Sequence, residues 1–214
     1  MGRFLVFLLL AGFGVLDRAQ GPATCVPGSP SLAMTFHIDP DQSKFMVHAH
    51  RGGLLWFKGN DHFVKVRRYS GEVQLDPSEA NAASLVMSIE ADSLEETGAV
   101  FTAQQKQTIK KELNDIVLEK DKYPQITFRS TAVTAKVQGQ QINARITGDI
   151  TLHGVTRRIE IPATVTVDGG GLRATGHFSI DRKKFGVKAT TAGHGTVRVQ
   201  HKLDFDFDMV AKSA

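Results

Sequence analysis

Residues 142–152 read Ile-Asn-Ala-Arg-Ile-Thr-Gly-Asp-Ile-Thr-Leu, a stretch in which apolar and polar side chains alternate. Successive side chains of a β-strand point to opposite faces, so this period of two predicts one buried face and one face in water. The expected buried positions are Ile142, Ala144, Ile146, Ile150 and Leu152. Such a pattern is typical of an antiparallel strand.

The same alternation returns on both sides of this stretch. It covers residues 159–167, 172–180 and 197–209, with shorter versions at 45–49, 85–89 and 126–128. We expect burial of Ile142, Ile146, Ile150, Phe178, Phe205 and Phe207, and exposure of Arg145, His153 and Asp206. Because an open sheet of this many strands would expose its edges, the pattern predicts one all-β domain, an extended antiparallel β-barrel of about eight strands.

One segment departs from the strand pattern. Between residues 102 and 118, the apolar side chains Ile109, Leu113, Ile116 and Val117 are spaced at i, i+4, i+7 and i+8. This spacing places them on one face of a helix, with charged residues on the other face. The sequence therefore predicts one main amphipathic helix that covers part of the barrel.

The N-terminus has the features of an export signal. Residues 4–16 form an apolar run of about 13 residues, which suits a signal peptide and is short for a membrane span of about 20. We expect a signal peptide at 1–24, a flexible lead-in at 25–33 and the barrel domain at 34–211, with the cleavage point left open. A retained anchor and a lipid attached to Cys25 are the alternatives.

Composition excludes several classes of protein. A single cysteine excludes a disulfide framework and a cysteine-rich zinc site. The net charge of +4 comes from scattered lysines and arginines, and aromatic residues make up 7% of the chain, so we expect no nucleic-acid partner. We also expect no cofactor. A nucleophile elbow of the form Gly-x-Ser-x-Gly is absent from the sequence, and we predict no catalytic residues.

Small residues on the expected inward faces bear on what fills the barrel. They are Ala49, Ala144, Gly148, Ala163, Ala174 and Gly176. A barrel of about eight strands holds either packed side chains or one ligand. Small inward side chains leave room inside, so the sequence favours a cavity over a filled core.

Two groups of polar residues could bind something. His48 and His50 lie two apart on one strand face, and His62 could add a third imidazole. We interpret them as hydrogen-bonded surface histidines and predict no metal site, with a metal site as the alternative. Lys65 and Arg67 form a basic patch near an apolar segment, and we consider them candidates for an anionic head group. Asp204, Asp206 and Asp208 are expected to pair with basic neighbours across the sheet.

Two further motifs resemble those of a known family. Tyr123-Pro-Gln-Ile-Thr-Phe-Arg-Ser-Thr131, followed by Ile146-Thr-Gly-Asp-Ile-Thr-Leu-His-Gly-Val-Thr156, closely resembles the YceI-like family, and the resemblance extends over 34–210. It implies a lipocalin-like barrel, exported in bacteria to the periplasm or secreted, that holds a long polyisoprenoid such as a polyprenyl quinone or polyprenyl phosphate. The only tryptophan, Trp56, does not match the Gly-x-Trp of true lipocalins, so that kinship is architectural.

The resemblance and the apolar strand faces together predict a non-enzymatic lipid carrier. The expected ligand-lining residues are Phe45, Val47, Leu85, Met87, Phe128, Ala144, Ile146, Ala174, Phe178 and Phe205. The alternative is a metal-binding or redox accessory protein that depends on His48, His50 and His62. Transient membrane contact and dimerisation are both left open.

Overall fold

The computed structural model describes residues 33–53, 56–189, 191–192 and 197–214. The predicted signal peptide, and all of the predicted lead-in except Ala33, lie outside the described residues. The strands are β1 (Met34–Ile38), β2 (Lys44–Gly52), β3 (His62–Val66), β4 (Tyr69–Leu75), β5 (Ser84–Glu90), β6 (Leu94–Glu96), β7 (Gln125–Gln138), β8 (Gln141–Leu152), β9 (Val155–Asp168), β10 (Gly171–Asp181), β11 (Thr191–Ala192) and β12 (Val197–Ser213). The helical segments are η1 (Trp56–Lys58), η2 (Pro77–Ala82), η3 (Ala91–Ser93), α1 (Ala103–Glu112), η4 (Leu113–Val117) and η5 (Arg182–Phe185).

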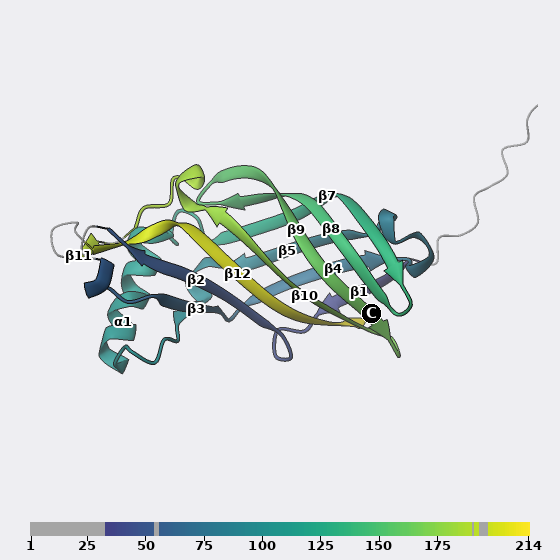
Figure 1. The fold of residues 1–214 in the computed structure, drawn as a ribbon, viewed down its shortest axis with the longest axis horizontal. Helices are drawn as coiled ribbons and strands as arrows, with labels where there is room; N and C mark the ends of the chain where they lie inside the picture. Colours follow the sequence, from purple (N-terminus) through teal and green to yellow (C-terminus); the bar gives the residue numbers. More distant parts are fainter. Residues whose placement is uncertain (1–32, 54–55, 190, 193–196) are drawn as a thin grey trace, which may run out of the picture. The chain divides into compact units, whose positions relative to one another are not determined.

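Eight antiparallel strands close into a barrel, as the alternation predicts. The hydrogen-bonded order is β1-β4-β5-β7-β8-β9-β10-β12, and β12 pairs back with β1. Figure 1 shows these strands winding obliquely around a common axis, with α1 at one end of the barrel. Closure pairs the edges of the sheet with each other and so removes them. Among the described residues, no helix has the length and apolar character that crossing a membrane requires.

The barrel wall is lengthened by strands that continue one another. The C-terminal end of β12 pairs with β1, and residues 198–208 of β12 pair with β2. β1 and β2 therefore lie one after the other along the same edge of β12. β3 and β6 extend the wall beside β2. At the bend between β1 and β2, the Ser43 hydroxyl donates to the Asp39 carbonyl at 2.6 Å and accepts the Val210 amide at 2.9 Å. These bonds keep the bent strand attached to β12.

The burial pattern follows the predicted alternation, with one exception. Ile142, Ile150 and Phe178 are buried, Ile146, Phe205 and Phe207 are half-buried, and Arg145 and Asp206 are exposed. The expected exposure of His153 is wrong, because only 10% of its side chain is exposed. The turn after β8 folds this ring onto Tyr123, with 4.4 Å between ring centroids, and places Nε2 2.6 Å from a Glu119 carboxylate oxygen. The segment that covers the turn lies about thirty residues away in sequence, so local alternation does not reveal it.

The predicted helix forms, but its second half is wound differently. Thr102 begins α1 with a capping box shared with Gln105. From Leu113 to Val117 the chain makes a π-helical turn, in which the Leu118 amide donates to the Leu113 carbonyl at 2.9 Å. The wider turn changes the phase of the helix. Ile116, expected on the buried face, is therefore 48% exposed, and Leu118 is buried instead.

Two of the small inward residues do not leave empty space. A Cβ on Gly148 would lie 2.4 Å from the Phe128 ring, and a Cβ on Gly176 would lie 2.4 Å from the Phe207 ring. Each glycine therefore makes room for an aromatic side chain from the neighbouring strand. The other four small residues, Ala49, Ala144, Ala163 and Ala174, line the cavities described below.

We expect Gly176→Ala to lower the free energy of unfolding by about 1–3 kcal/mol, because the new Cβ would overpack the wall. It would meet the Pro162 carbonyl oxygen at 2.3 Å, a backbone atom that cannot swing aside. Gly171→Ala on the same strand is the matched control, since its nearest atom lies 3.6 Å away. Urea unfolding of the two variants tests this, and equal stabilities would show that the wall tolerates a methyl group at Gly176.

Candidate functional site

An apolar cavity of about 130 Å³ lies inside the barrel towards η2. Its walls come from the inward faces of the eight barrel strands and β2, and among its described lining residues only Ser84 and Thr127 have polar side chains. Ala80 and Ala83 contribute to its lining at the η2 end. A site of this composition recognises apolar surface and offers little to a polar group.

A second apolar cavity, of about 190 Å³, lies at the opposite end of the barrel, towards α1. Ile109, Leu113, Val117 and Leu118 of the helical segment line it. The two cavities share five lining residues, which form a waist between them: Phe45, Ile89, Ile126, Ile150 and Phe178. We refer to these two adjoining cavities together as the two-lobed lumen, with each cavity as one lobe, and the helix covers one end of it.

All ten residues predicted to line a ligand site lie on this lumen. Leu85, Met87, Phe128, Ala144, Ile146 and Ala174 line the lobe towards η2, Val47 and Phe205 line the lobe towards α1, and Phe45 and Phe178 line both. Contact of these residues with a ligand stays a prediction. Ile126, Ile150 and Ile161 line the lumen in addition to these ten, and the same alternation marks them as inward-facing.

The two head-group candidates lie elsewhere. Arg67 is exposed and pairs with Glu95, with 2.8 Å between Nε and Oε2. Lys65 sits on β3 between the buried Val64 and Val66, so alternation directs it to the outer face of the barrel. Neither side chain lines the lumen, because each is one position out of phase with the inward face.

Polar groups meet the lumen at its α1 end instead. They are His62, Glu112, Arg182 and Lys188. Arg182 is held by the backbone, since its guanidinium donates to the carbonyls of Gln200, Val187 and Val199. Burial lowers the pKa of Arg182. Sequence patterns do not group these four residues, because they come from four separate segments that only the fold brings together.

A buried carboxylate fastens the segment that leads into α1. The Glu96 side chain has no exposed surface, and it contacts His62 Nδ1 at 2.8 Å. Its other oxygen accepts the amides of Phe63 at 3.2 Å and Gly98 at 2.6 Å. Burial alone would raise the pKa of Glu96, but the hydrogen bonds from His62, Gly98 and Phe63 outweigh it and hold this pKa below its ordinary value. His62 also stacks on Phe101, with 5.1 Å between centroids, so the approach to the helix is fixed.

The predicted trio of histidines is not assembled. His62 pairs in register with Ala49, and directly opposed residues share a face, so His62 points inward while His48 and His50 point outward. Asp61, which precedes His62, takes the third place beside His48 and His50. The hypothesis that His48, His50 and His62 form one cluster is therefore wrong for His62. The cluster that the structure contains is His48, His50 and Asp61.

Asp206 and Asp208 of β12 pair with basic residues of β10, as expected, whereas Asp204 is buried and contacts Ser179, Lys202 and His50. Asp208 receives two hydrogen bonds from Arg173, at 2.8 and 2.6 Å, and Asp206 contacts His177 Nδ1 at 2.8 Å. Arg173 lowers the pKa of Asp208. These pairs lie on the outside of the barrel and do not form a carboxylate site.

With the closed barrel and its apolar lumen established, the relation to known proteins becomes informative. A family model described as the YceI-like domain matches residues 36–211. The chain belongs to the YceI-like family. A UPF0312 protein of Pseudomonas savastanoi pv. phaseolicola is 41% identical over 101 residues, which are 44% of this chain and 49% of that protein. A UPF0312 protein of Vibrio cholerae is 31% identical over 146 residues, or 65% of this chain and 69% of that protein. The first of these matches thus spans about half of the relative's length.

Two solved structures share the fold of this YceI-like chain. Burkholderia cenocepacia BcnA superposes with a TM-score of 0.64 at 22% identity, covering 82% of this chain and 99% of BcnA. A polyisoprenoid-binding domain from Saccharophagus degradans gives a TM-score of 0.61 at 12% identity, covering 85% of this chain and 99% of that domain. At these identities the likeness establishes the lipocalin-like barrel fold.

Proposed function

We propose that this YceI-like protein is a non-enzymatic carrier that holds a long polyisoprenoid, or a lipid of similar shape, in its two-lobed lumen. The observation that carries the proposal is the lumen itself, two adjoining apolar cavities enclosed by strand faces and by the helical segments at the two ends. The polyisoprenoid-binding domain from Saccharophagus degradans has the same fold, which supports this class of ligand.

The energetics favour a chain-like apolar ligand. Each methylene removed from water contributes about 0.8 kcal/mol. A dozen buried carbons would therefore give about 10 kcal/mol, which exceeds moderate estimates of the cost of association. The lumen's aliphatic and aromatic lining does not discriminate between chains of similar width. We expect affinity for a class of lipids more than for one compound.

The two ends of the lumen differ, which suggests an orientation for the ligand. His62, Glu112 and Lys188 meet the lumen at its α1 end, whereas the η2 end presents Ala80 and Ala83. We infer that the polar head of the lipid lies near α1 and that the chain extends towards η2. The ligand would then enter at the end of the lumen that the helix covers.

We further propose that the protein works outside the cytoplasm, in the periplasm or as a secreted protein. The apolar run at 4–16 and the polar residues that follow it support export. A carrier is useful there, because an insoluble lipid needs an apolar enclosure to leave a membrane.

Mass spectrometry of the organic extract from freshly purified protein tests the proposed function. We expect one class of long apolar lipid, in near-stoichiometric amount, from protein that was never exposed to detergent. N-terminal sequencing of the same sample tests export, and we expect a start near residues 20–25 without a lipid on Cys25. An extract free of lipid, from protein that also fails to take up a polyprenyl quinone or a polyprenyl phosphate, would reject the carrier function.

A further inference from the structure

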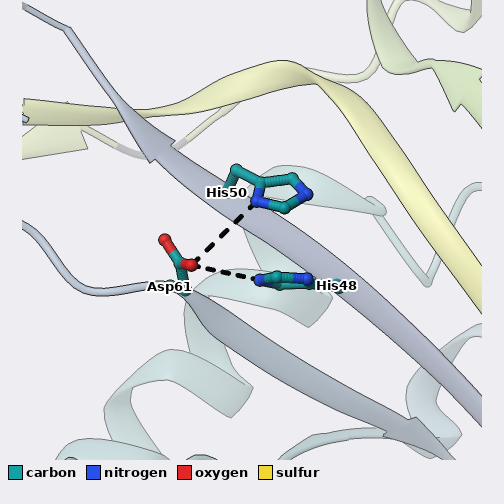
Figure 2. Close-up of side chains that lie close together, drawn as sticks. All are labelled: His48, His50 and Asp61. Carbon is teal, nitrogen blue, oxygen red and sulfur yellow. Dashed lines mark hydrogen bonds and ion pairs between the residues drawn. The ribbon is translucent and has the colours of Figure 1, made fainter.

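The outer face of β2 carries a cluster that the lipid site does not use. Figure 2 shows His48 and His50, two residues apart on this strand, both turned towards the Asp61 carboxylate at the start of β3. We propose that His48, His50 and Asp61 form a binding site for a borderline divalent transition-metal ion, of which Zn²⁺ is the representative.

The distances between the donor atoms suit one ion. Asp61 Oδ2 lies 3.1 Å from His48 Nε2 and 4.0 Å from His50 Nδ1, and the three ligand atoms all lie within 4.8 Å of one another. Bonds of about 2.0–2.2 Å in a tetrahedral shell place neighbouring ligand atoms roughly 3.3 Å apart. The separations of 3.1 and 4.0 Å from Asp61 Oδ2 lie on either side of that spacing.

A backbone hydrogen bond orients the Asp61 carboxylate. The Arg51 amide donates to Asp61 Oδ1 at 2.9 Å, which leaves Oδ2 to face the two imidazoles. The carboxylate is thus held with one oxygen directed at His48 and His50 in the absence of metal.

His50 is held by a second carboxylate on its far side. Its Nε2 lies 2.7 Å from Asp204 Oδ2, and Asp204 is itself fixed by Ser179 and Lys202. On the other side of the His50 ring, Nδ1 lies 4.0 Å from Asp61 Oδ2. Because Nε2 is taken by Asp204, Nδ1 is the nitrogen that an ion beside Asp61 would bind. A histidine bonded to a carboxylate on its outer nitrogen is the usual arrangement behind a metal ligand.

The donor set indicates the class of ion. Two imidazoles and one carboxylate suit Zn²⁺, Cu²⁺ or Ni²⁺, whereas Mg²⁺ and Ca²⁺ require oxygen ligands. The side chains of His48, His50 and Asp61 are 25%, 32% and 30% exposed, so an ion can enter and water can fill the fourth position. Bound there, the ion would tie β2 to the segment that leads into β3.

The test is a Zn²⁺ titration in competition with a chromophoric chelator, on full-length protein purified without a polyhistidine tag and stripped with EDTA. We expect one equivalent to bind, and no competition from millimolar Mg²⁺ or Ca²⁺. His48→Ala, His50→Ala and Asp61→Asn should each weaken binding by more than about 100-fold, since each removes a direct ligand. Asp204→Asn, which keeps the three ligands and changes the outer partner of His50, should weaken it about 10–100-fold. His37→Ala, at an exposed histidine on β1, is the control and should change nothing.

Thermal unfolding of the same proteins separates loss of the site from loss of the fold. Zn²⁺ should raise the melting temperature of the native protein and of His37→Ala, because an ion that binds the folded state stabilises it. Zn²⁺ should not change the melting temperature of His48→Ala, His50→Ala or Asp61→Asn, provided that these variants fold. The proposal is overturned if the native protein binds no stoichiometric Zn²⁺, or if variants that melt normally retain native affinity.

Discussion

Ala174→Phe should remove the lipid from the barrel and leave the barrel folded. Ala174 pairs with Val165 and Met209 across the sheet, and it lines the lobe towards η2. A phenyl ring placed there occupies the space that the chain of the ligand would need. We expect at least a tenfold fall in lipid recovered per mole of purified protein, with a small change in melting temperature.

The rival explanation is a barrel packed solid by its own side chains. In that case the added ring would overpack the core and lower the free energy of unfolding by about 1–3 kcal/mol. Ala144→Trp probes the same lobe from β8, and the two variants should behave alike. Thr175→Phe is the matched control, because it adds the same ring one residue along β10 on the exposed face. Unchanged lipid recovery together with a large loss of stability in the inward variants would reject the carrier function for these positions.

Glu96→Ala should lower the free energy of unfolding by about 3 kcal/mol, through the loss of one buried carboxylate that serves three partners. The amides of Phe63 and Gly98 would be left without their acceptor, and His62 would lose its anionic partner. Because these contacts fix the approach to α1, the cover of the lumen should also loosen. Urea unfolding gives the stability, and hydrogen exchange in residues 97–118 gives the local effect.

Two variants identify the cause of that loss. Glu95→Ala removes the neighbouring carboxylate, which is exposed and paired with Arg67, so its effect should stay below about 1 kcal/mol. Glu96→Gln keeps the shape of the side chain and removes its charge. Its loss of unfolding free energy should lie between those of Glu95→Ala and Glu96→Ala. Equal stabilities of Glu95→Ala and Glu96→Ala would contradict the structural role of Glu96.

The Glu96 carboxylate also makes the stability of the fold depend on pH in the acid range. The pKa of Glu96 is lowered in the folded protein, so its contribution is complete above the unfolded value of about 4.3 and is lost as the pH falls through the folded value. Stability should therefore decline below about pH 4.3 in the native protein. The decline should be shallower in Glu96→Gln, which has no carboxylate to protonate.

Much of the barrel is readable from the sequence because its strands alternate. The runs around Ile142, Phe178 and Phe205 predict the inward face, and the structure puts all three of these side chains inside. Alternation also selects lumen residues without any knowledge of strand order. It works here because one face of each strand is apolar and the other is wet, so register is strongly specified.

Alternation fails where another segment decides the environment. His153 is covered by Tyr123, and the space beside Gly148 and Gly176 is taken by phenylalanine rings from neighbouring strands. Ile116 turns outward because of a π-helical turn for which the sequence analysis found no signal. In each case the cause is a contact or a winding that the local pattern does not contain.

The all-β class, the closed barrel, the main helix and most of the lumen are predictable from the chain, because they depend on the period of hydrophobicity along single segments. Which polar residues meet depends on the three-dimensional fold. It placed His62 inside with Glu96, Asp61 outside with His48 and His50, and Lys65 away from the lumen. The physical reason is register: cross-strand partners come from distant parts of the chain, and a shift of one residue moves a side chain to the opposite face of the wall.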